Sequence, residues 1–145
     1  MADPVTFASA VDLMAVVIGH GTVDEVVGIE ARGFPYGAAL AYHLGAGFVT
    51  LRKPGKLPAA RMSVEYSLEY GESRLDIHED AMSPGTRALI VDDLLATGGT
   101  ALAAAKLVEL IGGVVAGLIF AIELEALEGR PRLASYTVRS LVAYA

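Results

Sequence analysis

The sequence predicts an α/β fold in which a central, mostly parallel sheet is flanked by helices. Segments with the length and composition of strands alternate with segments of helical length, an order typical of right-handed βαβ units. The run A-L-I-V at 88–91 is apolar at every position, which indicates a strand that is buried on both faces. A chain of 145 residues is long enough for one such unit, so we expect a single domain over 1–145.

Two helices and two strands are predicted in the first third of the chain. Asp3 and Pro4 suit the N-cap and the first position of a helix, and apolar residues then recur at helical spacing. Gly45 marks the end of a second helix. The predicted segments, in order, are a helix at 4–19, a strand at 26–29, a helix at 34–44, a strand at 47–51 and a loop at 52–62.

A surface hairpin is predicted next, over about 63–78. Apolar and polar residues alternate strictly from Ser63 to Gly71, which indicates an antiparallel strand with one solvated face. We expect Gly71 and Glu72 to form the turn and residues 74–78 to return as the partner strand. This hairpin is expected to act as a mobile flap beside the loop at 52–62.

The rest of the chain is predicted to continue the alternation of strands and helices. After the strand at 88–91, the chain is expected to turn at 94–96 and to enter a helix at Thr100. The further predicted segments are a helix at 100–111, a strand at 114–122, a short helix or turn at 124–128, and a last strand at 136–142, for which an edge position is one option.

Charge and composition exclude several classes of function. The net charge is −6, from 11 basic and 17 acidic residues, which argues against non-specific binding to nucleic acid. No stretch reaches the roughly 18 uncharged apolar residues of a membrane span, and cysteine is absent. Residues 1–4 lack the basic and apolar regions of a signal peptide, so we expect a cytoplasmic protein.

Positive charge is concentrated in the loop at 52–62. Arg52, Lys53, Lys56 and Arg61 place four of the 11 cations in this loop. Two interpretations are open, a binding site for a small anion or a charge run that is merely solvated. Because the protein as a whole is acidic, we favour the anion site.

The segment that follows the strand at 88–91 carries the strongest functional signal. Asp92 and Asp93 come first, and Leu94-Leu95-Ala96-Thr97-Gly98-Gly99-Thr100 leads from them into a helix. Glycines let the backbone approach a ligand closely, and the free N–H groups at a helix start favour a phosphate. Two carboxylates about 6 Å apart repel by roughly 3 kcal/mol at an effective dielectric constant near 20, so ribose hydroxyls or Mg²⁺ are expected to offset that repulsion. The alternative is a solvated acidic pair that caps the helix.

The run L-I-V-D-D-L-L-A-T-G-G-T at 89–100 resembles the phosphoribosyl pyrophosphate (PRPP) binding motif of the type I phosphoribosyltransferases. Further stretches resemble the adenine phosphoribosyltransferases of that superfamily, and together the matches extend over nearly the whole chain. They are G-I-E-A-R-G-F at 28–34, R-K-P-G-K-L-P at 52–58, Y-S-L-E-Y-G at 66–71 and G-R-P-R-L-A at 129–134. The resemblance implies the type I phosphoribosyltransferase fold with an antiparallel flap hairpin.

The resemblance also implies an activity, in which adenine and PRPP give AMP and pyrophosphate with Mg²⁺ in purine salvage, and it implies a homodimer. It assigns the ribose hydroxyls to Asp92 and Asp93, directly or through the metal, and PRPP to the loop of Leu94, Leu95, Ala96, Thr97, Gly98, Gly99 and Thr100. It assigns pyrophosphate to Arg32, Arg52, Lys53 and Lys56, and catalysis to Glu69, Arg32 and Lys53, with Glu69 as acid or base at the purine. From the residues alone, Glu69 and Arg32 are also compatible with solvated positions.

In the family, a further N-terminal segment precedes the first helix and forms a hood over the base, and Ala2-Asp3-Pro4 looks like its continuation. We therefore expect an intact PRPP half and a weakened site for the purine. Two alternatives to an active adenine-specific enzyme stay open, an impaired or regulatory protein that binds PRPP or a nucleotide, and transfer to another base such as hypoxanthine or xanthine. The stretch at 66–71 disfavours another base.

Overall fold

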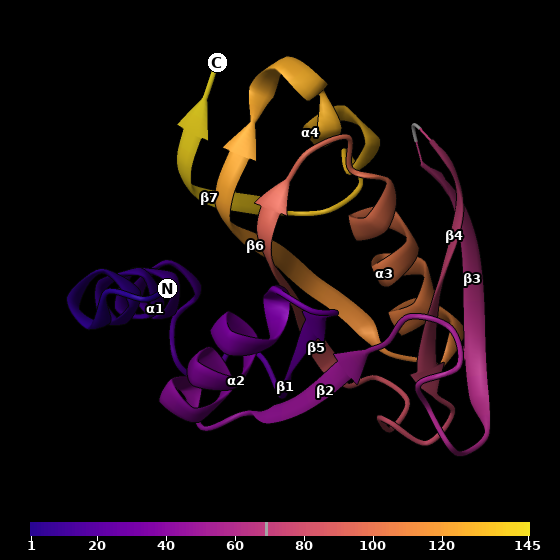
Figure 1. Ribbon diagram of the computed structural model, residues 1–145. Helices are drawn as coiled ribbons and strands as arrows, with labels where there is room; N and C mark the ends of the chain where they lie inside the picture. The colour runs from indigo at the N-terminus through magenta and orange to yellow at the C-terminus, as the bar shows by residue number, and fades with distance from the viewer. Residues whose placement is uncertain (69) are drawn as a thin grey trace.

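The computed structural model describes residues 1–68 and 70–145. Within these residues, five strands form one sheet in the order β2-β1-β5-β6-β7, and every neighbouring pair is parallel. The strands are β1 (Glu25–Ile29), β2 (Gly47–Leu51), β5 (Arg87–Leu95), β6 (Val114–Leu124) and β7 (Val138–Tyr144). The predicted α/β fold with a parallel sheet is thus confirmed, and β7 lies at an edge (Figure 1).

Helices cover both faces of the sheet. They are α1 (Pro4–Ile18), α2 (Gly33–Leu44), α3 (Gly99–Leu110) and α4 (Gly129–Arg132), with a 3₁₀ turn at Glu125–Leu127. Leu89 and Val91 of β5 pack on the side of α1 and α2, whereas Ile90 packs on the side of α3. The continuous apolar run that predicted a doubly buried strand therefore supplies both layers of the core. No helix among the described residues is long and apolar enough to cross a membrane.

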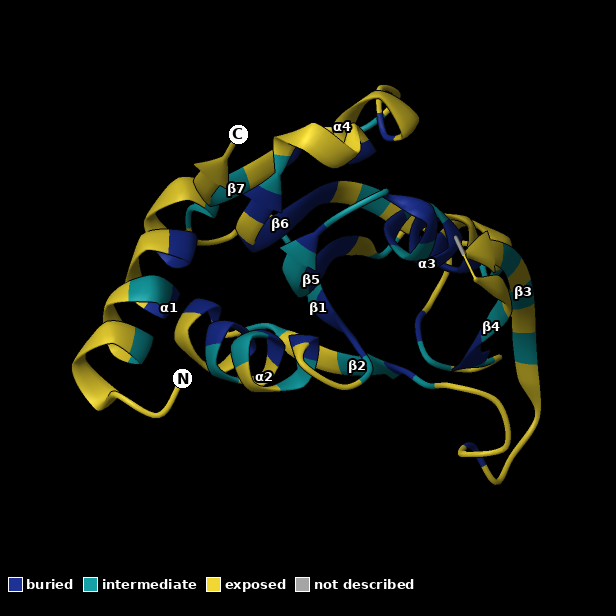
Figure 2. Cartoon of the chain, turned by 45° about the horizontal axis from the view of Figure 1, so that its top comes forward, coloured by how far each residue is buried: buried dark blue, intermediate teal, exposed yellow. Residues whose placement is uncertain are grey.

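The hairpin consists of β3 (Arg61–Leu68) and β4 (Gly71–His78), paired antiparallel. Met62, Val64 and Tyr66 point inward and pack against the core on the side of α3, as the alternating pattern predicts. The prediction that Gly71 and Glu72 form the turn is wrong, because they pair with Leu68 and Ser67 inside β4. Figure 2 shows the hairpin beyond α3, so that the helix lies between it and the sheet.

Other boundaries also differ from the prediction. β5 extends beyond Val91 to Leu95, because its parallel pairing with β6 continues to the pair Leu95 and Glu123. Asp92 and Asp93 therefore lie near the C-terminal end of β5 rather than after the strand. At the other end of the chain, the predicted N-cap is confirmed, since the Asp3 carboxylate accepts a 2.7 Å hydrogen bond from the Thr6 N–H.

A short bridge attaches the hairpin to the main sheet. The Arg52 N–H donates to the Asp76 carbonyl at 2.9 Å, and the Asp76 N–H donates back at 2.8 Å. The Asp76 side chain is fully buried, and it accepts hydrogen bonds from Ser63 Oγ at 2.7 Å and Arg74 Nε at 3.0 Å. Arg61 Nε lies 3.5 Å from the same carboxylate. One residue thus joins both strands of the hairpin to the loop that follows β2.

We predict that Asp76→Ala lowers the free energy of unfolding by about 2 kcal/mol, because it leaves the Ser63 hydroxyl and the Arg74 guanidinium without their acceptor. Asp76→Asn keeps an acceptor and should cost less. Urea denaturation measures both. The matched control is Asp12→Ala, which removes an exposed carboxylate that lies 3.5 Å from His43. An equal, small loss for Asp76→Ala and Asp12→Ala would contradict the anchoring role.

Candidate active site

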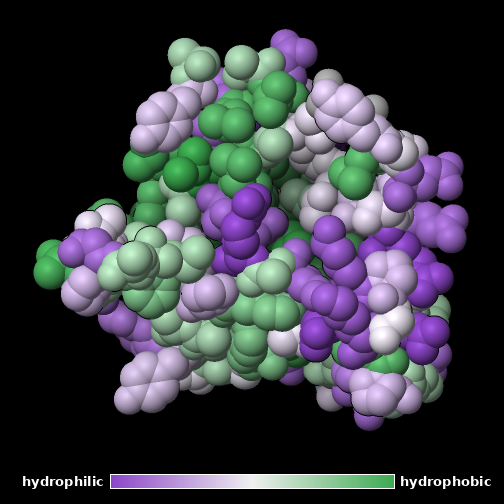
Figure 3. Space-filling view, viewed as in Figure 1, coloured by the Kyte–Doolittle hydropathy of each residue, from purple (hydrophilic) through white to green (hydrophobic). Residues whose placement is uncertain are grey.

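The functional residues meet at the edge of the sheet where the parallel strands end. The loops after β1, β2 and β5 and the inner face of the hairpin enclose a cavity of about 300 Å³. Its lining includes Glu30, Arg32, Lys53, Tyr66, Leu68, Leu75, Phe120 and all residues from Asp92 to Ala101. Figure 3 shows hydrophilic side chains at the centre of this face, bordered by hydrophobic ones. Ligands in open parallel sheets bind at this edge.

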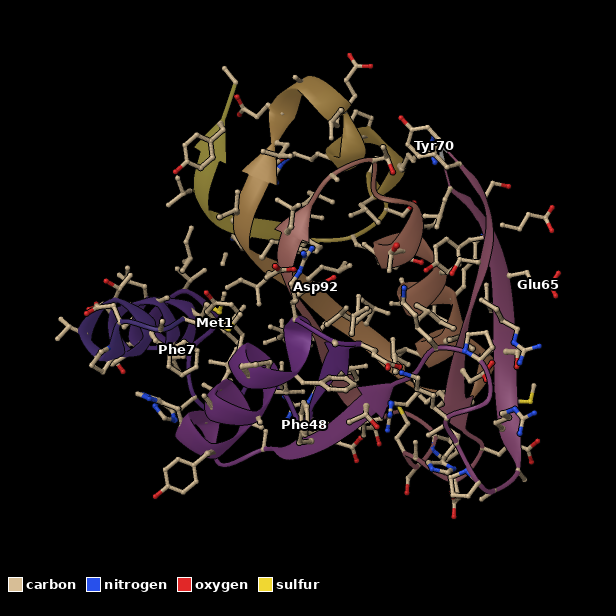
Figure 4. The ribbon with its side chains drawn as sticks, viewed as in Figure 1. Met1, Phe7, Phe48, Glu65, Tyr70 and Asp92 are labelled. Carbon is tan, nitrogen blue, oxygen red and sulfur yellow. The ribbon has the colours of Figure 1, made fainter. Side chains whose placement is uncertain are left out.

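The acidic pair lies beside Arg32. Asp93 Oδ2 and Arg32 Nε form an ion pair at 2.8 Å, and the Asp93 N–H donates to Asp92 Oδ1 at 2.8 Å. The Arg32 side chain is 68% exposed and that of Asp93 is 22% exposed. Asp92 lies near the centre of the view in Figure 4, between α2 and α3. The structure therefore brings together three of the residues that the sequence assigns to the site.

Gly33 makes this arrangement possible. A Cβ on Gly33 would lie 2.6 Å from the Val91 carbonyl oxygen and 3.1 Å from Asp92 Oδ1. Only glycine lets the start of α2 come this close to the end of β5. The preceding residue, Arg32, is thereby held next to the two carboxylates.

Asp92 has an unusual protonation equilibrium. Burial raises its pKa to about 7, and the negative charge of Asp93 adds to that rise. The hydrogen bond from the Asp93 N–H and the positive charge of Arg32 act in the opposite direction. At neutral pH the carboxyl group is therefore present in both forms. Hydrogen-bond donors or a cation that enter the cavity stabilise the ionised form.

The glycine loop, residues 96–100, follows β5 and forms another wall of the cavity. Gly98 adopts the left-handed conformation with φ of 81°, and α3 begins at the next residue. Its first N–H groups have no partner within the helix, and they line the cavity together with Thr97 and Thr100. Thr100 Oγ1 lies 3.4 Å from the hydroxyl of Tyr66, so the hairpin contacts this loop. The geometry suits a phosphate group.

The cations of the loop at 52–62, the basic loop, fall into two groups. The Glu30 side chain, 8% exposed, accepts hydrogen bonds from Lys56 Nζ at 2.7 Å, Arg52 Nε at 3.2 Å and the Lys53 N–H at 2.5 Å. Burial acts to raise the pKa of Glu30, but these hydrogen bonds outweigh burial and leave the pKa below its usual value. The charged ends of Arg52 and Lys56 are thus held by Glu30, while Lys53 lines the cavity. Sequence reasoning missed Glu30, although it lies in the stretch G-I-E-A-R-G-F.

A second, more open hollow adjoins the first. It has a volume of about 450 Å³ and is lined by Glu30, Ala31, Arg32, Lys53, Asp92 and Asp93. The acidic pair borders both hollows, as do Glu30, Arg32 and Lys53, whereas the glycine loop lines only the first. The site can therefore hold a ligand that carries negative charge at both ends and hydroxyl groups between them.

Glu69, to which the sequence assigns catalysis, lies outside the described residues. Leu68, immediately before it, lines the cavity. Tyr66, which the sequence analysis treated as part of the flap, lines the cavity as well and packs against the core. A period of two along β3 brings Tyr66 and Leu68 to the same face of the strand. This pattern could have predicted that the two side chains line one cavity.

Known proteins resemble this chain over nearly its whole length. The sequence model of the phosphoribosyl transferase domain matches residues 6–142. The adenine phosphoribosyltransferase of Clostridium perfringens is 56% identical over 144 residues, which are 99% of this chain and 84% of that protein. That of Acidothermus cellulolyticus is 54% identical over 142 residues, 98% of this chain and 80% of its own length. The crystal structure of the enzyme from Thermoanaerobacter pseudethanolicus superposes with a TM-score of 0.96 at 50% identity, covering 99% of this chain and 83% of that one.

The raised pKa of Asp92 predicts a pH dependence of stability in the ligand-free protein. Between about pH 4 and about pH 7 the folded state binds more protons than the unfolded state, so the free energy of unfolding falls as the pH rises. Asp92→Asn removes this dependence. Relative to the wild type, the variant should gain up to about 1.4 kcal/mol per pH unit in this window and no more above it.

Urea denaturation across the window measures the difference between variant and wild type. A difference for Asp92→Asn that stays constant with pH would show that the folded state does not raise the pKa of Asp92.

Proposed function

The chain belongs to the phosphoribosyl transferase family, within which it groups with the adenine phosphoribosyltransferases, and from this premise we propose that it converts adenine and PRPP into AMP and pyrophosphate. The observation that carries the proposal is the division of the site. The glycine loop at the start of α3 lines the first hollow, the open hollow lies beside Lys53 of the basic loop, and Asp92 and Asp93 border both. PRPP has a phosphate, two ribose hydroxyls and a pyrophosphate in this same order.

The phosphoribosyl half of PRPP binds along β5 and the loop after it. The 5′-phosphate accepts hydrogen bonds from the N–H groups of residues 96–100 and is favoured by the positive end of the α3 dipole. The ribose hydroxyls donate to Asp92 and Asp93, which ionises Asp92 fully and offsets the repulsion between the two carboxylates. Arg32 orients Asp93 through their 2.8 Å contact.

The leaving group binds in the open hollow, beside Arg32 and Lys53. The bond between ribose C1 and the pyrophosphate oxygen breaks while a bond from a purine nitrogen to C1 forms, so negative charge builds up on the leaving group. Arg32 and Lys53 neutralise that charge. Arg52 and Lys56, which the sequence also assigns to pyrophosphate, act through Glu30, because it holds their charged ends and positions the Lys53 backbone.

Glu69 accepts the proton that the purine nitrogen loses when it is alkylated by the sugar. The family resemblance supports this role. A positioned general base of this kind contributes about 10²–10⁴-fold to a rate. Tyr66 and Leu68 supply the apolar surface that excludes water from the activated sugar.

Mg²⁺ fits this site as a companion of the substrate. Among the described residues, no group of three or more His, Cys, Asp and Glu side chains could hold a metal ion by itself. Mg²⁺ commonly uses one or two carboxylates together with waters and substrate phosphates, and Asp92 and Asp93 can supply the carboxylate share. The ion would neutralise charge on the pyrophosphate. The homodimer and the cytoplasmic location that the resemblance implies stay predictions.

The proposed function is tested by incubating the protein with PRPP, Mg²⁺ and one purine base at a time. AMP should form with adenine, and no product is expected with hypoxanthine, xanthine or guanine. The variant Asp92→Asn with Asp93→Asn is the control and should form none. PRPP binding without any turnover would favour a regulatory binding protein, and turnover of another base would reassign the purine.

The division of the basic loop predicts a difference between two neighbouring lysines. Lys53→Met should weaken the binding of pyrophosphate by roughly tenfold, because it removes a cation from the hollow itself. Lys56→Met should weaken it by about twofold at most, since Lys56 ends on Glu30. Titration calorimetry with Mg²⁺ and pyrophosphate measures both. Equal losses would show that Lys56 leaves Glu30 and contacts the leaving group.

A further inference from the structure

The turn that contains α4 lies directly against the glycine loop. A Cβ on Gly129 would lie 2.2 Å from the Ala96 carbonyl oxygen and 3.0 Å from the Gly98 nitrogen. Conversely, a Cβ on Gly98 would lie 2.6 Å from the Gly129 carbonyl oxygen. The two backbones are therefore in van der Waals contact with no side chain between them. The position of Gly129 therefore constrains the backbone of residues 96–98.

The next residue, Arg130, clamps this turn to the sheet. Its Nε donates to Glu123 Oε1 at 2.9 Å, and its Nη1 donates to the Val138 carbonyl at 2.9 Å. Its Nη2 donates to Glu123 Oε2 and, at 3.1 Å, to Ser140 Oγ. Ser140 Oγ in turn donates to Glu123 Oε2 at 2.7 Å. The planar guanidinium is thus fixed on β6 and β7 in one orientation.

Glu123 connects Arg130 to the end of β5, which leads into the cavity wall. In the parallel pairing of β5 with β6, Glu123 is the register partner of Leu95, the residue that immediately precedes Ala96. A closed ring of contacts therefore runs from Leu95 to Glu123, Arg130 and Gly129 and back to Ala96. Glu123 is only 5% exposed, so water competes little for these hydrogen bonds.

We propose that Glu123 and Arg130 are positioning residues that set the geometry of the 5′-phosphate loop, residues 96–100, through the contact between Gly129 and Ala96. This inference rests on the proposed function. The pair acts on the phosphate half of the site, since the ring of contacts ends on the glycine loop. The basic loop is held separately, by Glu30 and by the bridge to Asp76.

The ionisation of the pair supports a permanent clamp. Hydrogen bonds from Arg130 hold the pKa of Glu123 below its usual value, although burial acts in the opposite direction. The same contact raises the pKa of Arg130. Both groups therefore stay charged at the pH at which the enzyme works.

The test compares two ligands that occupy opposite halves of the site, ribose 5-phosphate and pyrophosphate. Arg130→Lys keeps the charge but loses the planar fork that reaches Glu123, Val138 and Ser140 together. In titration calorimetry it should raise the Kd for ribose 5-phosphate by roughly tenfold and leave the Kd for pyrophosphate within about twofold of the wild type. In steady-state kinetics the KM for PRPP should rise while the KM for adenine does not.

The matched control is Arg87→Lys. Arg87 also grips one carboxylate with its fork, at 2.7 Å and 3.0 Å on Asp24, but at the opposite end of the sheet. This variant should leave the ratio of the two Kd values unchanged. If Arg130→Lys does not fold, Ser140→Ala removes one contact to each member of the pair and should raise the Kd for ribose 5-phosphate by about threefold.

Two results would overturn the positioning role alone. One is that Arg130→Lys leaves both Kd values unchanged, while the wild type binds both ligands and makes AMP. The other is an equal weakening of both ligands, which would indicate general loosening of the fold. A wild type that binds pyrophosphate but neither ribose 5-phosphate nor PRPP would instead overturn the proposed function, and the positioning role with it.

Discussion

The pairing of β5 between two parallel neighbours is the constraint on which the site depends. β1 and β6 hold β5 on both sides as far as Val91, and the pairing with β6 continues to Leu95, so the last residues of β5 cannot shift without breaking that ladder of hydrogen bonds. Parallel strands end at one edge, so the segments that follow β1, β2 and β5 must meet there. The acidic pair at 92–93 and the glycine loop at 96–100 are thereby placed by the central strand of the sheet.

Several charged groups at this edge have a defined partner of opposite charge. Glu30 holds Arg52 and Lys56, and Arg32 holds Asp93. Asp92 accepts a hydrogen bond from the Asp93 N–H, and burial keeps the pKa of Asp92 near neutrality. In the complex that we propose with PRPP, the ribose hydroxyls would offset this free-energy cost, because a hydrogen bond to an ionised acceptor in a buried site is stronger than one in water.

Much of the fold could be predicted from the sequence, since strands and helices follow from local patterns of apolar residues and glycines. For the same reason, the run at 89–100 predicted a loop between strand and helix, which the structure places in the cavity wall. What the sequence could not predict was which cation each carboxylate holds. Arg52 and Lys56 are 22 and 26 residues from Glu30, and their pairing depends on the path of the loop between them. The turn placed at Gly71 failed because alternation marks a strand well but its end poorly.

The hairpin links the two halves of the site. At its base, Asp76 is bonded to Arg52, where the basic loop begins, and along its length Tyr66 reaches Thr100 of the glycine loop. We expect a ligand that orders either loop to restrict the hairpin as well, because the hairpin contacts both loops. By linkage, such a coupling acts equally in both directions. In the function we propose, PRPP carries a phosphate at one end and a pyrophosphate at the other and meets both loops at once, so it would gain from the coupling what its separate fragments cannot.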